Sequence, residues 1–356
     1  MGEAGDIAVI SMPFIAGAAV GMYWQPMPWL APVLAAACIT ILWRTPRFVR
    51  ITTTLLYFLL GMMCAHVHAA AGMHGILLPE LEPFPLQCRT RLQLLIASIP
   101  FPNEGTAGII TALTTGMKDG VPKEVIQTFR LSGASHILAL SGLHLGVIYS
   151  IVSKCCSVLG NSRLSDRIRF VTILSFAGFY TLMTGSGPSI VRAFLFIAIR
   201  ETGRLFSQRS YSAGRCLMAA MLIQVLFNPE VILSAGFQMS YLAMCGIVFL
   251  LPNLQKLWEG KGILHWIWDS CCLAVSCQLF TGPVAWFRFH SFPRHFLISN
   301  ILALPLSSII MVLAVATITL HACGICPDCL PVLLDRAVCV LLWVLETVSA
   351  IGYGAG

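Results

Sequence analysis

The chain has 356 residues, of which 57% are hydrophobic and only 10% are charged, and its formal net charge is +7. A mean hydropathy of +0.84 excludes a series of soluble domains and predicts a polytopic membrane protein. The positive charge identifies no partner, because basic cytoplasmic loops produce the same excess in bacterial membrane proteins. The sequence contains no phosphate-loop motif, so we predict neither nucleotide hydrolysis nor a bound cofactor.

Successive apolar runs are each about long enough to cross a bilayer as a helix. They predict an all-α fold of about eleven transmembrane helices, several of them broken or kinked around a polar cavity. The runs cover residues 7–23, 28–43, 51–70, 134–159, 168–185, 188–206, 211–228, 234–252, 266–287, 296–321 and 331–351.

Basic residues cluster in two of the predicted loops, which are therefore expected in the cytoplasm. The clusters are Arg44, Arg47 and Arg50, and Arg163, Arg167 and Arg169. Acidic residues before the first run argue against a cleavable signal peptide, so the first run is predicted to be a retained helix. Because two runs precede the first basic loop, the amino terminus is also predicted to lie in the cytoplasm. The predicted organisation is amino-terminal transmembrane helices over 1–72, an outer-side connector with interfacial helices over 73–133, and a channel domain over 134–356.

The segment HILALSGLHLG at 136–146 places polar groups and glycines inside one apolar run. An unsatisfied polar group in lipid is costly, so such groups are paired or line a wet cavity. Candidate channel-lining or pairing residues here are His136, Ser141 and His144, while Gly142 and Gly146 favour a helix break or close helix packing. Simple helix packing with hydrogen-bonded histidines is the alternative interpretation.

The segment TGSGPSIVRA at 184–193 predicts that a helix restarts, because Pro188 suits the first helical turn. Arg192 follows one turn later and brings a permanent cation into or near the membrane. The cation either snorkels to the interface or faces a polar path.

Two further segments combine polar residues with helix signals. The segment NPEVILSAGFQMSYLAMC at 228–245 places four polar side chains on one helix face: Ser234, Gln238, Tyr241 and Cys245. Such a stripe forms either a hydrogen-bonded seam between helices or the lining of a pore. Near the carboxyl end, Pro283 and Pro305 predict kinked helices beside amide and hydroxyl groups.

The sequence contains only incomplete patterns for a metal site and for an enzyme active site. The spacing of Cys323, Cys326 and Cys329 is typical of metal ligands but lacks a fourth ligand nearby, so we predict no metal and a loop between the last two spans. Ser141 and His144 resemble a nucleophile and its base, but no acidic residue in that segment would orient the base. We therefore predict that the chain is not an enzyme.

Four blocks in this order resemble the ComEC family of competence proteins: FRLSGASHILALSGLHLG at 129–146, GSGPSIVRAFLF at 185–196, NPEVILSAGFQMSYLAMCGI at 228–247 and NILALPLSS at 300–308. The resemblance implies that residues from all four blocks shape a DNA path, namely His136, Ser141, Gly142, His144, Gly146, Pro188, Arg192, Gln238, Ser240, Asn300 and Pro305. It covers residues from about Leu92 to the carboxyl end. The OB-like and metallo-β-lactamase-like domains of many family members are expected to be absent from this chain.

The function that the resemblance implies is a channel component of the bacterial inner membrane, which imports single-stranded transforming DNA without sequence specificity. The expected partners are the lipid bilayer, the DNA, a separate ATPase and a separate nuclease, and a homodimer is left open. A transporter of small solutes or lipid precursors is the main alternative, because broken helices around a polar cavity serve it equally well. A truncated, inactive family member is another.

Overall fold

A computed structural model describes residues 4–23, 30–44, 49–71, 83–160, 162–207, 211–290 and 296–353. Regular secondary structure in these ranges is helical throughout, as the predicted fold class requires, and no strand occurs in them. Arg47 of the predicted basic loop and residues 73–82 of the predicted connector lie outside the described residues.

The chain forms two compact units. One contains residues 1–79 and 195–241, and the other contains residues 80–194 and 242–356. These units group the chain differently from the three predicted domains, because residues 195–241 pack with the amino-terminal helices. The predicted division by membrane position stays a prediction.

The first unit is built on α1 (Ala4–Tyr23), α2 (Leu30–Arg44), α3 (Val49–Ala71) and α11 (Ala213–Phe227). Glycines allow α1 and α3 to pack closely: a β-carbon on Gly17 would overlap the carbonyl oxygen of Phe58, and one on Gly61 would overlap that of Phe14. The ring nitrogen Nε2 of His68 lies 3.1 Å from the carbonyl oxygen of Leu226, which connects α3 to α11.

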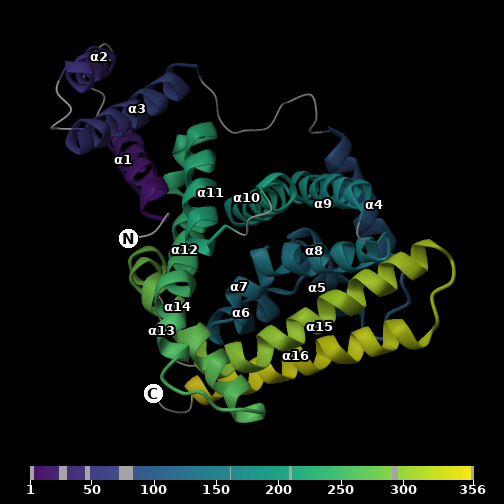
Figure 1. Cartoon of the computed structure of the whole chain (residues 1–356). Helices are drawn as coiled ribbons and strands as arrows, with labels where there is room; N and C mark the ends of the chain where they lie inside the picture. The colour runs from purple at the N-terminus through teal and green to yellow at the C-terminus, as the bar shows by residue number, and fades with distance from the viewer. Residues whose placement is uncertain are drawn as a thin grey trace. The chain divides into compact units, whose positions relative to one another are not determined.

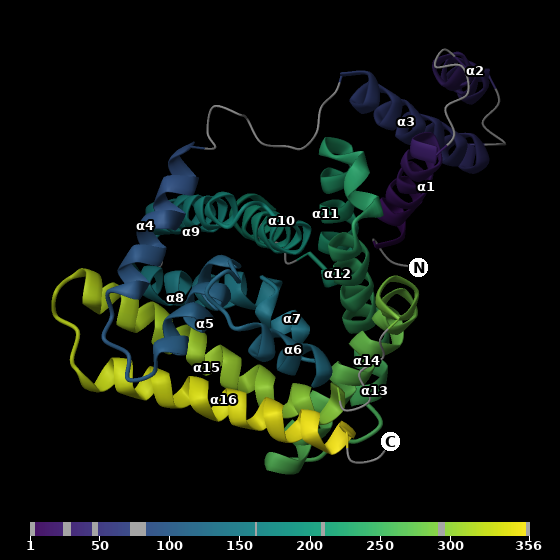
Figure 2. The ribbon, with the colours of Figure 1, turned by 180° about the vertical axis from the view of Figure 1, so that it is seen from behind.

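The second unit is organised around two long antiparallel helices, α15 (Phe296–Ala322) and α16 (Cys329–Tyr353), which lie side by side in Figures 1 and 2. Other helices of this unit are α4 (Pro83–Ala97), α5 (Glu104–Thr115), α6 (Lys123–Leu131), α7 (Ser135–Leu138), α8 (Gly142–Ser157), α9 (Arg163–Met183) and α14 (Ile263–Phe289). Buried side chains of α5, such as Ile110 and Leu113, pack with Met311 of α15 and Leu341 of α16 in one apolar core. Helix α10 (Pro188–Thr202) and the helix that begins with α12 (Ala235–Cys245) are divided between the two units.

The segment 98–132 runs alongside α15 from one end of that helix to the other. The Ser98 hydroxyl lies 3.1 Å from Nε2 of His321 near the carboxyl end of α15, whereas the Ser299 hydroxyl, near its amino end, donates to the carbonyl of Ser132. A helix of 27 residues is about 40 Å long. Much of the predicted connector therefore lies beside a candidate span, where α5 buries its apolar residues against α15 and α16. Its position on the outer side of the membrane stays a prediction.

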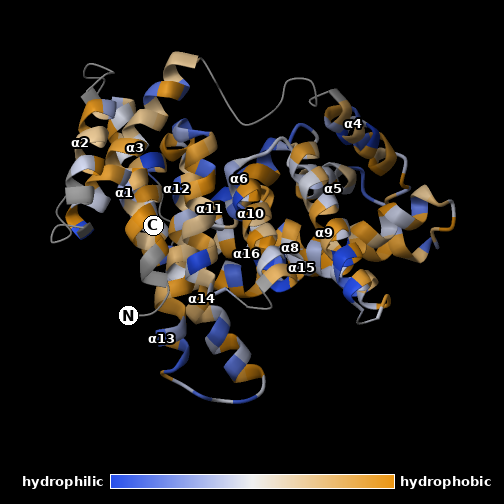
Figure 3. Ribbon diagram, turned by 45° about the horizontal axis from the view of Figure 1, so that its top comes forward, coloured by the Kyte–Doolittle hydropathy of each residue, from blue (hydrophilic) through white to orange (hydrophobic). Residues whose placement is uncertain are grey.

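Four helices among the described residues are long and apolar enough to cross a membrane: Arg50–Ala71, Ala235–Gln255, Ile263–Phe289 and Phe296–Ala322. Eleven spans are thus not confirmed. The run at 134–159 is divided into two helices, and α16 is long but carries Asp335, Arg336 and Glu346. Figure 3 shows hydrophobic residues along most of the α15–α16 pair, and hydrophilic ones at the turn between α13 (Leu251–Gln255) and α14.

Candidate functional site

The predicted helix break at the first polar segment is present. Helix α7 ends at Leu138, residues 139–141 are not helical, and α8 begins at Gly142. Ala139 and Ser141 have extended backbone angles, with ψ values of 130° and 170°. The run at 134–159 is therefore a short helix followed by a second, independently capped one.

Ser141 and His144 form the cap of α8. The Leu143 N–H donates to the Ser141 hydroxyl at 3.2 Å, and the Ser141 N–H donates to Nδ1 of His144 at 3.1 Å. This reciprocal pair is a capping box in which histidine occupies the position usually held by Glu or Gln. Because Nδ1 accepts a hydrogen bond, the imidazole proton is assigned to Nε2.

The imidazole of His144 is fully buried, whereas His136 before the break is exposed. Nε2 of His144 has no hydrogen-bond partner among the described residues. The Ser141 hydroxyl lies 3.1 Å from Nδ1 of His144, within reach for proton transfer. That same nitrogen accepts the Ser141 backbone N–H, and no described group orients the ring from its other side, so the contact serves to cap the helix.

Arg192 reaches the start of α8 from α10, which begins at Pro188 as predicted. A β-carbon built on Gly142 would lie 3.0 Å from Nη2 of Arg192 and 3.4 Å from Cβ of Ala193. The absence of a side chain at Gly142 therefore lets the guanidinium rest against the first residue of α8. The structure thus brings together Ser141, Gly142, His144 and Arg192, which the sequence selected separately.

A groove of about 710 Å³ runs along α8. Four of its lining residues, Gly142, Gly146, Ser150 and Lys154, recur every four residues and so share one helix face. Val312 of α15 also lines the groove, and Lys154 is exposed near its far end. The lining of this α8 groove is mostly apolar, with Leu143, Val147 and Ile151 beside one hydroxyl and one cation, and Arg192 lies against Gly142 at its other end.

Gly146 corrects one expectation. Close packing was predicted there, but a β-carbon on Gly146 would meet nothing within 4 Å. The reason is that Gly146 faces the α8 groove and not a neighbouring helix. Close contact occurs instead at Gly246, where a β-carbon would overlap the carbonyl oxygen of Ser276 on α14.

The remaining predicted residues belong to other helices. Gln238 and Ser240 belong to the first unit, where the amide of Gln238 donates to the carbonyl of Ile232 at 2.9 Å. In the same unit the Tyr241 hydroxyl donates to Gln224 at 3.0 Å, so part of the predicted polar stripe is an interhelical seam. Asn300 is half-buried in the second turn of α15, and Pro305 lies inside that helix.

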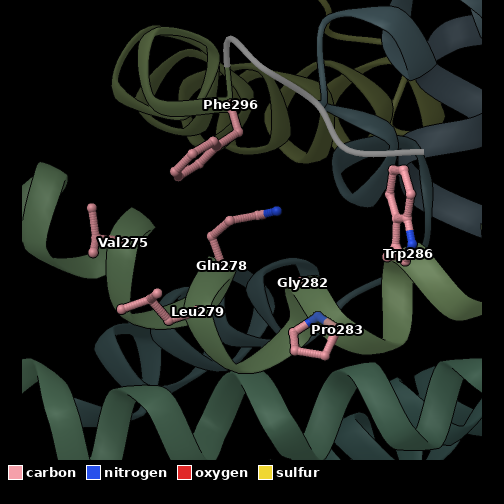
Figure 4. Close-up of a pocket in the computed structure, with 7 residues that line it drawn as sticks. All are labelled: Val275, Gln278, Leu279, Gly282, Pro283, Trp286 and Phe296. Atoms are coloured by element: carbon pink, nitrogen blue, oxygen red, sulfur yellow. The ribbon is translucent and has the colours of Figure 1, made fainter. Parts of the chain in front are cut away.

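A second pocket, of about 550 Å³, lies between α14 and the start of α15. Figure 4 shows Gln278 projecting from α14 into this space, with Trp286 and Phe296 at its sides. Pro283, which was predicted to kink its helix, lies inside α14 and lines the same pocket. The lining is apolar apart from Gln278, which suits an organic molecule or an acyl chain.

Within the described part of the chain, no group of three or more His, Cys, Asp or Glu side chains is placed to hold a metal ion. Cys323 and Cys326 lie in the turn between α15 and α16, and Cys329 begins α16. All three carry free thiols.

Two residues that sequence reasoning did not select occupy notable positions. A β-carbon on Gly185 would lie 3.7 Å from Nη1 of Arg89, so this arginine of α4 approaches the turn before α10. Asp335 of α16 is buried and accepts hydrogen bonds from the Asn103 amide, at 2.7 Å, and from the Thr106 hydroxyl. The sequence could have identified Asp335 as a functional or structural candidate, because it is a charged residue inside an apolar run. No feature of the sequence predicted that Arg89 lies near Gly185.

The long apolar helices and the capped break in a polar segment define a helical membrane protein with discontinuous helices. The family model described as "Competence protein" matches residues 113–354. The chain therefore belongs to the competence protein family, and the ComEC resemblance is confirmed. The matched region contains the break, the α8 groove and the α15–α16 pair.

Curated relatives agree with this assignment. The chain is 29% identical over 200 residues to ComE operon protein 3 of Bacillus subtilis, covering 56% of this chain and 24% of the relative. It is 28% identical over 167 residues to competence protein ComA of Neisseria gonorrhoeae, covering 43% of this chain and 22% of the relative. It is 23% identical over 222 residues to recombination protein 2 of Haemophilus influenzae, covering 58% of this chain and 27% of the relative. The chain thus spans about a quarter of each of these relatives. No solved structure matches significantly.

Proposed function

We propose that the protein forms part of the path by which single-stranded transforming DNA crosses the bacterial inner membrane. The observation that carries the proposal is the α8 groove, which has cations near both ends and lies inside the family-matched region. A path for DNA needs a wet surface that neutralises phosphates without reading bases. The glycines and the Ser150 hydroxyl along the groove, with Arg192 and Lys154 near its ends, support such a path, although most of the lining is apolar.

The proposal includes about eleven crossings with a cytoplasmic amino terminus, of which the run at 134–159 is divided between α7 and α8. It assigns no catalysis to Ser141 and His144, because their geometry is that of a helix cap. Transport then depends on an ATPase and a nuclease supplied by other polypeptides or domains. A homodimer is compatible with this arrangement.

Filling the α8 groove tests the proposal. Gly146→Trp places an indole in the groove, on a residue whose β-carbon would meet no neighbour within 4 Å, and should reduce transformation by at least tenfold at unchanged protein level. Gly105→Trp is the matched control, because Gly105 of α5 is also open on its β-carbon side but does not line the groove. Equal transformation frequencies in both variants would contradict a path along α8.

One observation favours a second function, the transport of a small solute or lipid precursor. The pocket of about 550 Å³ beside Gln278 has the size and apolar lining of a site for an organic molecule. Replacing Gln278 with Leu separates the two functions. Both functions predict normal transformation in this variant; a solute site additionally predicts that solute transport is lost, whereas a DNA path along α8 alone predicts no solute transport in the parent to lose.

A further inference from the structure

Three cysteines lie close together in the turn that joins α15 to α16. Cys323 follows the last residue of α15, Cys326 lies within the turn, and Cys329 begins α16. Of the fourteen cysteines in the chain, three are exposed, and two of these are Cys323 and Cys329. The turn therefore carries most of the exposed thiols of the protein.

The backbone of the turn separates Cys323 from the other two cysteines. The Gly324 N–H donates to the carbonyl of His321 at 3.0 Å. The Ile325 N–H donates to the carbonyl of Leu320 at 3.1 Å. These two bonds, with a φ angle of 72° at Gly324, form the left-handed cap that commonly ends a helix. Cys323 thus belongs to the end of α15, and the chain changes direction after it.

Cys326 and Cys329 lie together at the start of α16. The Cys326 thiol donates to the carbonyl of Pro327 at 3.7 Å. The same carbonyl accepts the Leu330 N–H at 3.0 Å, which closes a turn over residues 327–330. The sulfur of Cys326 therefore lies against the turn that carries Cys329. Residues three apart in a helical turn have Cα atoms about 5 Å apart, within the range of about 4.4–6.8 Å that a disulfide spans.

Hydrogen bonds to the segment 98–103 hold both sides of this turn. The Ser98 hydroxyl lies 3.1 Å from Nε2 of His321 on α15. Asp335 of α16 accepts a hydrogen bond from the Asn103 amide at 2.7 Å. The backbone is thus fixed on either side of the thiols, so the two sulfur atoms at the start of α16 approach each other by side-chain rotation with both helices in place.

We propose that Cys326 and Cys329 are a redox-active pair that forms a reversible disulfide by exchange with a small disulfide such as oxidised glutathione. This inference is independent of the proposed DNA path. The exposed Cys329, as a thiolate, attacks one sulfur of the incoming disulfide and releases the other half as a thiolate. Cys326, also as a thiolate, then attacks the sulfur of Cys329 and displaces the second half. The pair loses two electrons and two protons, and the incoming disulfide is reduced to two thiols.

Mass spectrometry of the full chain tests the proposal. The protein in detergent is equilibrated with mixtures of reduced and oxidised glutathione, and free thiols are then blocked with N-ethylmaleimide in denaturant. Trypsin cleavage after Arg294 and Arg336 gives one peptide with all three cysteines of the turn. In oxidising mixtures this peptide should be lighter by two hydrogen atoms through a bond between Cys326 and Cys329, with Cys323 outside that bond. In reduced glutathione alone it should carry a maleimide on each of the three cysteines.

Cys323→Ser is the matched control, because Cys323 is exposed in the same turn. This variant should form the disulfide at the same glutathione ratio as the parent. Cys326→Ser should stop at the mixed disulfide, with glutathione retained on Cys329.

Three outcomes with the parent would each overturn the inference and leave the proposed function standing. The first is a maleimide on all three cysteines at every glutathione ratio. The second is glutathione retained on both Cys326 and Cys329. The third is a disulfide that includes Cys323.

Discussion

Replacing the buried carboxylate Asp335 should destabilise the second unit. Asp335 accepts hydrogen bonds from the Asn103 N–H, at 3.3 Å, the Asn103 amide and the Thr106 hydroxyl. Asn103 is exposed, so water replaces its lost acceptor at little cost, but Thr106 is buried and its hydroxyl would remain unpaired. An unpaired buried donor costs about 1–3 kcal/mol, so with the loss of the charged bonds Asp335→Leu should cost about 2–4 kcal/mol.

A double-mutant cycle isolates the contact between Asp335 and Thr106. Thr106→Val removes the hydroxyl that Asp335→Leu leaves unpaired, so the double variant should be more stable than the sum of the two single effects predicts, by about 1–2 kcal/mol. Unfolding is followed by tryptophan fluorescence in mixed micelles with increasing SDS. Asp328→Asn is the control, because Asp328 is exposed in the adjoining turn and should change stability by less than about 0.5 kcal/mol.

Strict additivity of Asp335→Leu and Thr106→Val would refute this reasoning, and so would an Asp335→Leu variant as stable as the parent. Asp335→Asn should lie between parent and Leu, because the amide oxygen still accepts one hydrogen bond.

Three further predictions concern packing, the cap and topology. Gly246→Ala should lower the yield of folded protein in size-exclusion chromatography, because its β-carbon overlaps a carbonyl of α14, whereas Gly146→Ala should not. His144→Gln should keep most transformation, since Gln is an ordinary capping-box residue, while His144→Leu should abolish it; equal loss in both would disprove the cap role. Single cysteines are placed at Asn103 and Asp328 in a protein without exposed native cysteines. Both should react with an impermeant reagent from the same side of the membrane, because Asn103 bonds to α16 near the turn that contains Asp328.

Local sequence signals predicted the helix boundaries that matter most for the site. A proline after glycine and serine predicted the start of α10 at Pro188, and the Ser-Gly pair inside an apolar run predicted the break before α8. Both features depend on a few neighbouring residues. The capping role of Ser141 and His144 also depends on residues only three positions apart, so the sequence could have predicted it. These polar groups were interpreted as lining a cavity or pairing between helices instead.

Contacts between distant segments could not be predicted in this way. Asn103 and Asp335 are 232 residues apart, and the approach of Arg89 to Gly185 depends on how α4 packs beside α9. The sequence could not fix the number of spans for a related reason. An apolar run has the same composition whether it forms one membrane-spanning helix or two shorter helices. Gly146 shows that spacing identifies a helix face but not what that face meets.

Photo-crosslinking during DNA uptake tests most directly whether the strand follows the α8 groove. A photo-crosslinking amino acid is placed at Ser150, which is exposed within the groove, or at Trp343, which is exposed on α16 and does not line it. Cells carrying each variant are irradiated while they take up labelled donor DNA. We predict that the single strand crosslinks to position 150 and not to position 343. Uptake that proceeds normally without a crosslink at position 150, or with equal crosslinking at both positions, would contradict a DNA path along α8.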